Sequence, residues 1–336
     1  MNNILDLLSD KKRQLDTHKP FPKVLIRNIE EWLKVELTYT SNAIEGNTLT
    51  RIETAEVIER GVTAVISGKS LKEQLEALNH AKAVDFIKDL SVRLKGHQFI
   101  TEQDILAIHK IILSGIDDAG AGVYRHVDVF IRGKDVEFPR PNAVPQLMKE
   151  FIQWLEGQQN AHPVSVAAEA HFRLVSIHPF IDSNGRTTRL LMNLILLLNG
   201  YPMAIIKTEE RTTYLDAINK AQKGKDFTEF YAIMEHAVDR SLDVYLNAVK
   251  GEFPLSPITK PIKTGKLLRI GKLAKITGEP VAVIAFWTRE KLLPVSSRTA
   301  GGYNLYDEAL IVRIKEIRRL QTQERLTIEE IKERLQ

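Results

Sequence analysis

The sequence predicts a mainly α-helical protein in which an orthogonal helical bundle carries a β-hairpin and precedes a small second domain. Apolar residues recur at i, i+3 and i+4 from Ile4 to about Arg240, which is the spacing of helices that bury one face. Segments 24–37, 71–90 and 227–238 show this pattern most clearly. A length of 336 residues is enough for about two folding units with a core in each.

The segment Tyr124–Pro139 (YRHVDVFIRGKDVEFP) departs from the helical pattern. Val127, Val129 and Ile131 alternate with other residues before a Gly-Lys-Asp turn, as in a short exposed β-hairpin. An isolated hairpin is marginal in water, so it either packs against another element or serves to bind an extended ligand. The sequence leaves both alternatives open.

Composition excludes several classes of protein. The chain has no cysteine, which excludes disulfides, thiolate metal sites and a cysteine nucleophile, and fits a reducing compartment. Its N-terminus mixes charged and apolar residues and lacks the apolar core of a signal peptide, so we expect a cytoplasmic protein. The most apolar stretch, 190–198, is about half of the ~20 residues that span a bilayer, so we expect a buried helix and no membrane association.

Charge is distributed unevenly along the chain. From Ser256 onward there are 16 Lys and Arg against 9 Asp and Glu, whereas the preceding part has 31 against 34. Such asymmetry is typical of an appended nucleic-acid-binding segment, and it also occurs where a face is simply solvated.

The stretch Ile177–Arg189 (IHPFIDSNGRTTR) has the features of a phosphate site. Asn184 and Gly185 fall at the expected start of a helix, where free N–H groups and the helix dipole attract an anion. Arg186 and Arg189 share one helical face, and guanidinium groups match phosphate oxygens.

Two further residues of this stretch can supply chemistry. Asp182 can hold a Mg²⁺ ion that bridges phosphates, because Mg²⁺ takes few protein carboxylates. His178, with an ordinary pKa of about 6.5, can accept a proton from an attacking hydroxyl. Each feature alone has a structural interpretation, as a buried histidine, a turn with an N-cap, or solvated arginines. Their combination favours a functional site.

These residues resemble the signature of Fic-domain proteins, HxFx(D/E)GNGRxxR. The helix expected over 162–176, the hairpin and the segment 211–225 also follow the order and spacing of the family, so the resemblance covers about 31–238. It implies a Fic-type orthogonal bundle with a β-hairpin flap. It also implies an adenylyltransferase that moves AMP from ATP to a Ser, Thr or Tyr hydroxyl of an unidentified target protein, with Mg²⁺.

The same resemblance implies a role for each matching residue. His178 would be the general base, Asp182 the metal ligand and Arg189 the partner of the γ phosphate. Asn184, Gly185 and Arg186 would cradle the α and β phosphates. The ATP-binding positions that the resemblance implies, including those near the nucleoside and in the flap, are Ser183, Asn184, Gly185, Arg186, Arg189, Tyr214, Leu215, Gln222, Val129, Phe130, Ile131 and Arg132.

Ser183 departs from the family pattern, which has glycine at this position. A Cβ narrows the approach of a phosphate and disfavours a positive φ. We therefore expect a tighter turn or a shifted nucleotide at Ser183, with the site retained.

Residues 40–48 (TSNAIEGNT) read as a Ser/Asn capping signal, one helical turn, and a stop at Gly46 and Asn47. A short connecting helix is the structural interpretation. Beside the first motif, however, Ser41-x-x-x-Glu45-Gly46 resembles the inhibitory (S/T)xxxE(G/N) helix of one class of Fic proteins. That resemblance implies that Glu45 pairs with Arg189 and keeps it from the γ phosphate. In some relatives the same glutamate is associated with removal of AMP, so de-AMPylation or another nucleotidyl or phosphoryl transfer remains an alternative.

The stretch after Gly251 carries three prolines and no helical periodicity, which predicts a linker. Residues 268–293 then have helix-turn-helix spacing, and further helices are expected over 307–321 and from Thr327. Residues 270–335 resemble the winged helix of MerR-type regulators, with a wing at Arg298–Tyr303 (RTAGGY). The predicted division is an N-terminal region 1–95 with the inhibitory helix at about 40–48, a catalytic domain 96–250, a linker 251–266 and a winged-helix domain 267–336.

The expected recognition helix of this second domain is apolar. Val281, Ala282, Val283 and Ala285 stand where MerR-type proteins often carry Arg and Tyr, and base readout needs hydrogen-bond donors. The alternatives are therefore DNA binding, which would make the chain a nucleotide-sensing DNA-binding regulator, and protein docking or homodimerisation. The candidate DNA contacts are Lys272, Lys275, Arg289, Arg298 and Tyr303.

Overall fold

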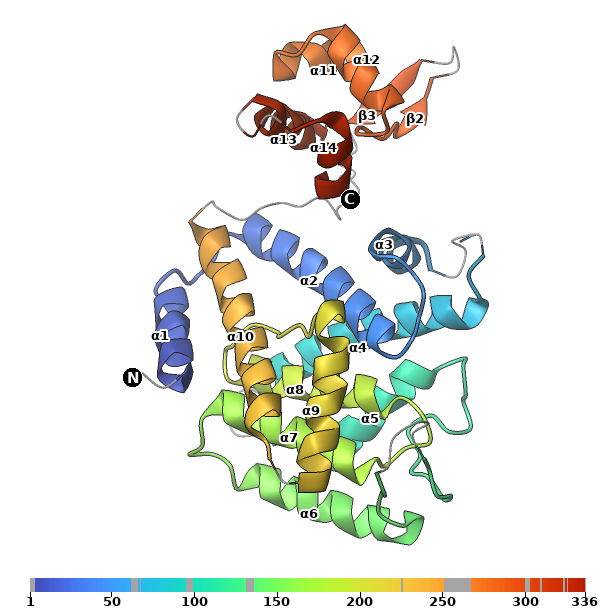
Figure 1. Cartoon of the computed structure of the whole chain (residues 1–336), viewed down its shortest axis with the longest axis vertical. Coiled ribbons are helices and arrows are strands. Elements are labelled where there is room, and N and C mark those ends of the chain that lie inside the picture. The colour runs from blue at the N-terminus through green and yellow to red at the C-terminus, as the bar shows by residue number, and fades with distance from the viewer. Residues whose placement is uncertain are drawn as a thin grey trace. The chain divides into compact units, whose positions relative to one another are not determined.

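The computed structural model divides the chain into two compact units, Met1–Phe253 and Pro254–Gln336 (Figure 1). The residues that it describes are 4–61, 66, 68–94, 99–130, 136–224, 226–250, 267–299, 303–308, 310–322, 324 and 326–335. The predicted linker, 251–266, lies outside this set.

The described part of the first unit is helical. Its elements are α1 (Ile4–Asp16), α2 (Lys23–Ile44), α3 (Arg51–Arg60), α4 (Leu71–Arg93), α5 (Glu102–Leu113), η2 (Pro141–Ala143), α6 (Val144–Glu156), α7 (Pro163–Ile177), α8 (Asn184–Leu198), η3 (Thr208–Glu210), α9 (Arg211–Gly224) and α10 (Thr228–Val249). The three segments with the clearest helical spacing lie in α2, α4 and α10, so those predictions are confirmed.

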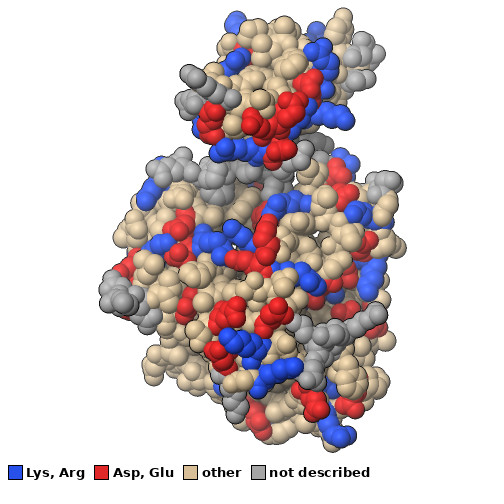
Figure 2. All heavy atoms as spheres, viewed as in Figure 1, with Lys and Arg blue, Asp and Glu red and all other residues tan. Residues whose placement is uncertain are grey.

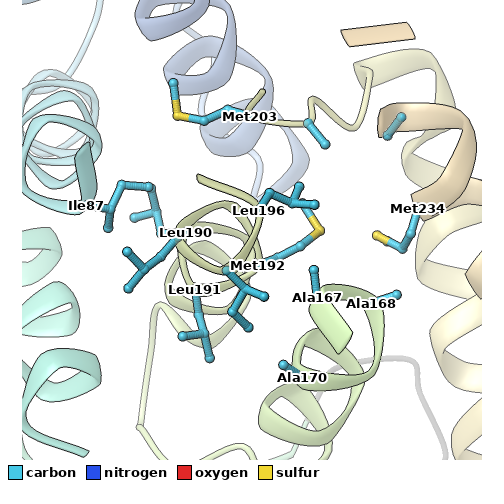
Figure 3. Packing of buried hydrophobic residues seen from close by; sticks show 14 of the residues in the cluster. Ile87, Ala167, Ala168, Ala170, Leu190, Leu191, Met192, Leu196, Met203 and Met234 are labelled. Atoms are coloured by element: carbon cyan, nitrogen blue, oxygen red, sulfur yellow. The ribbon is translucent and has the colours of Figure 1, made fainter. Parts of the chain in front are cut away.

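Helix α8 forms the centre of the first unit, where it packs against α4, α5 and α7. Leu190, Leu191 and Met192 of α8 are at most 1% exposed. Figure 3 shows these side chains surrounded by Ile87 of α4 and by small alanines of α7, of which Ala167 is one. Small residues on α7 let the two helices approach closely, so the expected buried helix is confirmed and the start of α8 is held rigidly.

A capping box fixes the start of α4. Ser70 Oγ accepts a hydrogen bond from the Glu73 N–H at 3.2 Å, and the Glu73 carboxylate accepts one from the Ser70 N–H at 3.0 Å. Glu73 Oε1 also accepts a hydrogen bond from the hydroxyl of Thr48, at 2.6 Å. The chain that follows α2 is therefore tied to the first turn of α4.

The helix expected at about 40–48 is the last part of α2, which begins at Lys23 and ends at Ile44. The Ser/Asn capping signal at this point is therefore wrong, because Ser41 lies inside the helix. The stop after it is confirmed, since Gly46 has a φ of +96° that favours glycine.

The predicted hairpin is only partly visible. Its turn, 131–135, lies outside the described residues. The described arms, 124–130 and 136–139, form no strand, so strand pairing is not found in that part of the chain. The arms are instead held by side-chain contacts that are described below.

The second unit contains β1 (Leu267–Arg269), α11 (Ile270–Thr277), α12 (Val281–Arg289), β2 (Ser297–Arg298), β3 (Asn304–Asp307), α13 (Leu310–Thr322) and α14 (Ile328–Leu335). Its antiparallel sheet has the order β1-β3-β2, with Leu268 opposite Tyr306 and Arg298 opposite Asn304. Trp287 is fully buried in its core. The predicted helix-turn-helix is confirmed by α11 and α12. The predicted wing at Arg298–Tyr303 is flanked by β2 and β3, and its residues 300–302 lie outside the described residues.

One boundary in the second unit differs from the prediction. Asp307 pairs with Leu267 in the sheet, so the helix expected to begin at Asp307 begins at Leu310. Among the described residues of both units, no helix is long and apolar enough to cross a membrane.

Candidate active site

The loop between α7 and α8 has two non-glycine residues in the left-handed region. His178 has a φ of +51° and Ser183 a φ of +63°. Ser183 thus adopts a positive φ although its Cβ disfavours one, and the expected tighter turn or shifted nucleotide stays a prediction. Its hydroxyl accepts a hydrogen bond from Arg186 Nη2 at 2.9 Å, and its carbonyl accepts one from the Thr187 N–H at 3.0 Å. These bonds offset the cost of the left-handed conformation.

The side chain of Asn184 holds the loop closed. Its Oδ1 accepts a hydrogen bond from the Phe180 N–H at 3.0 Å, and its Nδ2 donates one to the Phe180 carbonyl at 2.9 Å. Asn184 is also the first residue of α8, so its backbone N–H is among those that have no partner within the helix. The loop thus presents the positive end of a helix beside His178.

His178 is held in the geometry of a proton acceptor. Its Nδ1–H donates to the Val175 carbonyl at 3.2 Å, which leaves the lone pair of Nε2 available. Its ring stacks on Phe138 with 4.1 Å between the centroids. Burial lowers the pKa of His178 to about 4, against a smaller opposing effect of the hydrogen bond to Val175. His178 is therefore neutral at physiological pH.

Arg189, on the first turns of α8, is bound by the C-terminal end of α2. Its Nη2 lies 2.7 Å from Glu45 Oε1 and 2.9 Å from the Ser41 carbonyl, and its Nε donates to Ser41 Oγ at 3.0 Å. Burial alone would lower the pKa of Arg189, but the Glu45 carboxylate and the Tyr214 hydroxyl together outweigh it and raise that pKa. The pairing that the resemblance implied is present in the structure.

Gly185 makes room for the Glu45 carboxylate. A Cβ at Gly185 would stand 2.2 Å from Glu45 Oε1 and 3.1 Å from Arg189 Nη1, so a side chain there would displace the Glu45 carboxylate from this position. The carboxylate of Glu45 consequently lies against the first turn of α8, where an anion would bind.

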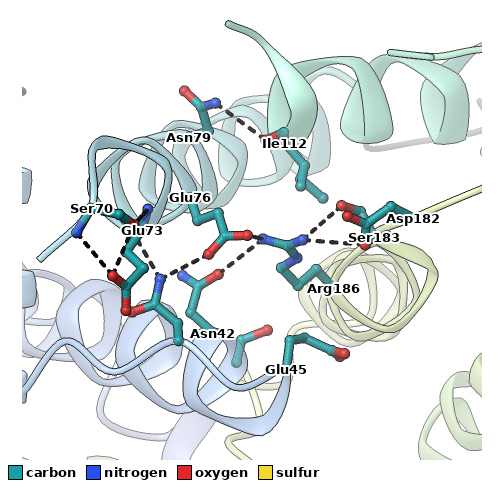
Figure 4. A network of polar contacts seen from close by, with 12 residues as sticks. Asn42, Glu45, Ser70, Glu73, Glu76, Asn79, Ile112, Asp182, Ser183 and Arg186 are labelled. Carbon is teal, nitrogen blue, oxygen red and sulfur yellow. Dashed lines mark hydrogen bonds and ion pairs between the residues drawn. The ribbon is translucent and has the colours of Figure 1, made fainter. Parts of the chain in front are cut away.

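Arg186 is paired with a second carboxylate (Figure 4). Its Nη1 lies 3.3 Å from Glu76 Oε1, and its Nη2 lies 3.6 Å from Asp182 Oδ1. Asn42 of α2 accepts a weaker hydrogen bond from the same arginine at 3.4 Å. Arg186 is 3% exposed, so Glu76 supplies much of the counter-charge that a buried guanidinium requires.

The carboxylate of Asp182 suits a magnesium ion. Its side chain is 53% exposed and lies just before the start of α8. Among the described residues, no three His, Asp or Glu side chains gather into a metal cage. A single accessible carboxylate fits an ion that takes its other ligands from a nucleotide and from water.

The residues expected near the nucleoside occupy different environments. Tyr214 is buried, and its hydroxyl lies 2.8 Å from His171 Nε2 and 3.5 Å from Arg189 Nη1. Leu215 is half-buried, and Gln222 Nε2 donates to Ser176 Oγ at 3.2 Å. Tyr214 thus contacts Arg189.

Only part of the expected flap can be placed. Phe130 is 84% exposed at the tip of the first arm, close in sequence to Val129. Ile131 and Arg132 lie outside the described residues. A large exposed aromatic side chain at this point is available to a bound ligand.

Arg125 is a site residue that was not predicted from the sequence. Its Nε donates to the His178 carbonyl at 2.8 Å, its Nη1 donates to the Val127 carbonyl at 3.1 Å, and its Nη2 donates to the Pro139 carbonyl. Arg125 therefore fastens both arms of the flap to the loop that holds His178. An arginine at the start of an otherwise apolar alternating segment was the one available signal.

His109 and Glu76 were also missed. Both lie on helices whose periodicity predicts only a buried face, and neither belongs to a local motif. Their partners are far away in the sequence, so one sequence gives no signal for them.

In the second unit, three of the candidate DNA contacts line one cavity. Lys272, Arg289 and Tyr303 surround a space of about 810 Å³, together with Arg269 of β1. Lys275 is exposed but does not line this cavity. The side chain of Arg298 is not among the side chains that the structure describes. On the face shown in Figure 2, acidic and basic side chains are interspersed over both units.

Two segments of the chain match known families. Residues 99–196 match the Fic/DOC family, and residues 268–336 match the MerR HTH family regulatory protein. The chain is 35% identical over 239 residues to the protein adenylyltransferase Fic of Aedes aegypti, covering 70% of this chain and 46% of that protein. It is 35% identical over 245 residues to the protein adenylyltransferase Fic of Nematostella vectensis, covering 72% of this chain and 56% of that protein. The chain thus spans about half the length of the curated relatives it matches.

Solved structures agree with the Fic match. Fic-1 from C. elegans is 31% identical with a TM-score of 0.67, covering 74% of this chain and 72% of that one. A Fic domain containing signaling protein from Bacteroides thetaiotaomicron is 27% identical with a TM-score of 0.67, covering 74% of this chain and 99% of that one.

Proposed function

The chain belongs to the Fic/DOC family, and we propose that it transfers AMP from ATP to a Ser, Thr or Tyr hydroxyl of another protein. The observation that carries this proposal is the arrangement at the start of α8. There, Gly185, Arg186 and Arg189 surround an anion position next to His178, whose Nε2 is free to accept a proton. The curated relatives, named protein adenylyltransferase Fic, support the same activity.

In this mechanism each residue has one task. Arg186 binds the α and β phosphates and Arg189 the γ phosphate, with the backbone N–H groups of α8 completing the cradle. Asp182 would hold Mg²⁺, which neutralises phosphate charge when it is bound. His178 Nε2 removes the proton from the target hydroxyl as its oxygen bonds to the α phosphorus. The bond from that phosphorus to the bridging oxygen breaks, and pyrophosphate leaves.

We further propose that Glu45 inhibits this reaction. Its carboxylate binds the arginine that would hold the γ phosphate and lies against Gly185, where a phosphate oxygen would be placed. ATP would then bind with its α phosphate displaced from the line of attack, and a displacement of ~1 Å can reduce a rate ~100-fold. Displacement of Glu45 would activate the enzyme.

The test is mass spectrometry of four full-length proteins incubated with ATP, Mg²⁺ and a cell extract: wild type, Glu45→Gly, Glu45→Gln and Glu45→Gly/His178→Ala. We expect an AMP increment on Glu45→Gly itself or on extract proteins, and none with the double variant. Glu45→Gln keeps the shape of the side chain and loses its charge, so its labelling should be intermediate. Absence of labelling with Glu45→Gly, while ATP binding is measurable, would contradict the proposal.

A second function, binding to the DNA backbone, is favoured by the basic cavity of the winged helix. Arg269, Lys272 and Arg289 line it beside Tyr303, and no acidic residue is among its lining residues. Such a site attracts phosphate through a salt-dependent interaction. The exposed start of α12, with Val281 46% exposed, offers no donors for base readout, so we propose weak sequence selectivity.

This second function is tested by fluorescence anisotropy of the full chain with duplex DNA at two salt concentrations. Lys272→Glu/Arg289→Glu should weaken binding at least tenfold at low salt and reduce its salt dependence, since two phosphate contacts are lost. Lys275→Glu is the matched control, because Lys275 lies on the same helix as Lys272 but outside the cavity. Equal losses in both variants would point to overall charge and exclude the cavity as the site.

Two further properties remain proposals. We propose a cytoplasmic location, which the use of ATP and the absence of cysteine support. A target protein of unidentified sequence would approach along the flap, where Phe130 is exposed.

A further inference from the structure

His109 is a buried histidine on α5 that contacts the loop of the candidate active site. It is 1% exposed, and its ring stacks on Phe180 with 3.6 Å between centroids and 7° between planes. Its Nε2 lies 3.1 Å from the carbonyl oxygen of Asp182, and its Nδ1 accepts a hydrogen bond from the Gly122 N–H at 2.9 Å. The ring of His109 therefore joins α5 to two other segments of the chain, Gly122 and the loop that contains Phe180 and Asp182.

The hydrogen bond from Gly122 determines the tautomer of His109. Because Nδ1 accepts a hydrogen bond from the backbone N–H of Gly122, its lone pair is in use and the proton of the neutral ring must lie on Nε2. Nε2–H then donates to the carbonyl of Asp182. Both ring nitrogens are satisfied by backbone groups, and neither is available for catalysis.

Gly122 is suited to this contact. Its φ is +75°, and a Cβ would stand 3.1 Å from the carbonyl oxygen of Leu106 and 3.2 Å from Cβ of Lys110. The absence of a side chain lets the backbone of Gly122 approach α5 closely enough to donate to His109.

The result is a loop fixed from two sides. Asn184 binds the backbone of Phe180 from within the loop, and His109 binds the backbone of Asp182 from α5. The carbonyl of Asp182 is thereby held, while its carboxylate remains 53% exposed, with Oδ1 accepting a hydrogen bond from the Ser183 N–H. The position of this carboxylate thus depends on a hydrogen bond made by a different helix.

We propose that His109 is a positioning residue, which orients Asp182 toward Mg²⁺ and the phosphates of ATP and thereby supports AMP transfer. This inference rests on the proposed function. An apolar ring of the same size would fill the space of His109 but would leave the Asp182 carbonyl without its donor. Loss of that donor would affect the contribution of the metal to ATP binding, whereas a role in packing alone would affect only stability.

The experiment compares His109→Asn with His109→Gln in full-length Glu45→Gly protein. The two replacements are polar and differ by one methylene. An Asn amide reaches about as far as Nδ1 and bonds only Gly122, whereas a Gln amide reaches about as far as Nε2 and can donate to Asp182. Isothermal titration calorimetry measures the ATP affinity with Mg²⁺ and with EDTA, and mass spectrometry measures kcat and KM for AMP transfer.

We expect His109→Asn to reduce the Mg²⁺-dependent gain in ATP affinity and kcat each by about tenfold, the lower end of the effects seen when a residue that supports a metal ligand is replaced. Its ATP affinity in EDTA should not change. His109→Gln should recover most of both losses. Tyr124→Phe is the matched control, since Tyr124 also packs against Phe180, at 5.8 Å between centroids, but donates its hydroxyl to Glu102.

The outcomes separate this inference from the proposed function. If Glu45→Gly transfers AMP and His109→Asn keeps both its kcat and its Mg²⁺-dependent gain, the positioning role is wrong and the function stands. If no protein transfers AMP, the proposed function fails, and the Mg²⁺-dependent gain in affinity still tests His109. Equal losses in His109→Asn and His109→Gln would reduce the role of His109 to packing and overturn the inference.

Discussion

Glu45 Oε1 lies 2.7 Å from Arg189 Nη2, beside a glycine whose missing Cβ leaves space for the carboxylate. One acidic side chain therefore covers both the arginine and the helix start that together form an anion position. Arg189 keeps three other contacts, to the hydroxyl and carbonyl of Ser41 and to Tyr214. Removal of Glu45 should thus expose the guanidinium without displacing it.

Ser41→Ala should weaken the inhibition partly. It removes the acceptor of Arg189 Nε and leaves the ion pair with Glu45, so we expect labelling by ATP to rise about two- to tenfold above wild type and to stay below that of Glu45→Gly. The free energy of unfolding should fall by about 1 kcal/mol, because a lost hydrogen bond to a charged group is partly offset by the helix propensity of alanine.

Labelling assays and urea denaturation measure these two effects. Ser91→Ala is the matched control, since Ser91 is another buried serine within a helix, where its hydroxyl donates to the Lys88 carbonyl. Labelling by Ser41→Ala equal to that of Ser91→Ala would show that Ser41 has no part in the inhibition.

Glu76→Gln should destabilise the protein and enlarge its response to ATP. Arg186 is 3% exposed, so the loss of a paired charge should lower the free energy of unfolding by about 1–3 kcal/mol. A bound phosphate would replace that charge, so ATP should raise the melting temperature of the variant more than that of wild type.

Differential scanning fluorimetry with and without ATP tests this prediction. Glu36→Gln is the control, because Glu36 is another buried carboxylate, paired with Arg51 at 2.9 Å. It should lower the melting temperature without changing the shift caused by ATP. An ATP shift for Glu76→Gln no larger than that of wild type would argue against phosphate binding at Arg186.

The local features of the site could be predicted from the sequence because they are contiguous. The loop, the start of α8 and its two arginines lie within thirteen residues, so their spacing alone places them on one face of a helix. The contacts that hold this loop could not be predicted. Arg125, His109 and Glu76 come from other elements, and a single sequence does not show whether a polar or charged residue is buried or exposed.

The end of α2 shows how tertiary packing overrides a local signal. Ser41 and Asn42 have the composition of an N-cap, yet the helix runs through them because Leu37 and Ile44 continue its buried face. Their polar groups are satisfied within the site: Ser41 accepts from Arg189, and Asn42 Nδ2 donates to the Thr38 carbonyl at 3.0 Å. Whether Ser and Asn side chains cap a helix or lie within it thus depends on the hydrogen-bond partners that the folded structure offers them.

Acidification should destabilise the first unit well before its carboxylates titrate. Burial lowers the pKa of both His80 and His171 to about 3, far below the ordinary value near 6.5. Between pH 6.5 and about 3, the unfolded chain binds two protons at these positions that the folded chain does not, so stability falls as pH falls. Each histidine contributes up to about 1.4 kcal/mol per pH unit in this window.

Urea denaturation at pH 7, 6 and 5 measures this slope. His80→Gln should make the free energy of unfolding depend less steeply on pH, because glutamine does not titrate and only the contribution of His171 then remains from this pair. A free energy of unfolding that is the same at pH 5 as at pH 7 would contradict the prediction.

The rate of AMP transfer should decrease with falling pH only well below pH 7. The pKa of His178 is lowered to about 4 by burial, and Glu45 opposes that shift, so Glu45→Gly should lower it further. His178 is then already deprotonated throughout the neutral range. We expect kcat/KM of Glu45→Gly, which reports the free enzyme, to be flat between pH 6 and 8 and to fall only below about pH 5. A half-maximal value near pH 6.5 would show that His178 is not the base or is not buried in the free enzyme.

Substitutions at Ser183 separate its backbone conformation from its hydroxyl. Ser183→Ala keeps the Cβ at a φ of +63° and loses the hydrogen bond from Arg186, so the free energy of unfolding should fall by about 2 kcal/mol. Ser183→Gly loses the same bond but removes the Cβ from a left-handed residue, which recovers about 1 kcal/mol. Chemical denaturation should therefore rank wild type above the glycine variant and the alanine variant last. If Ser183→Ala were as stable as Ser183→Gly, residue 183 would not be left-handed, and the turn would differ from the one that places Asn184 at the start of α8.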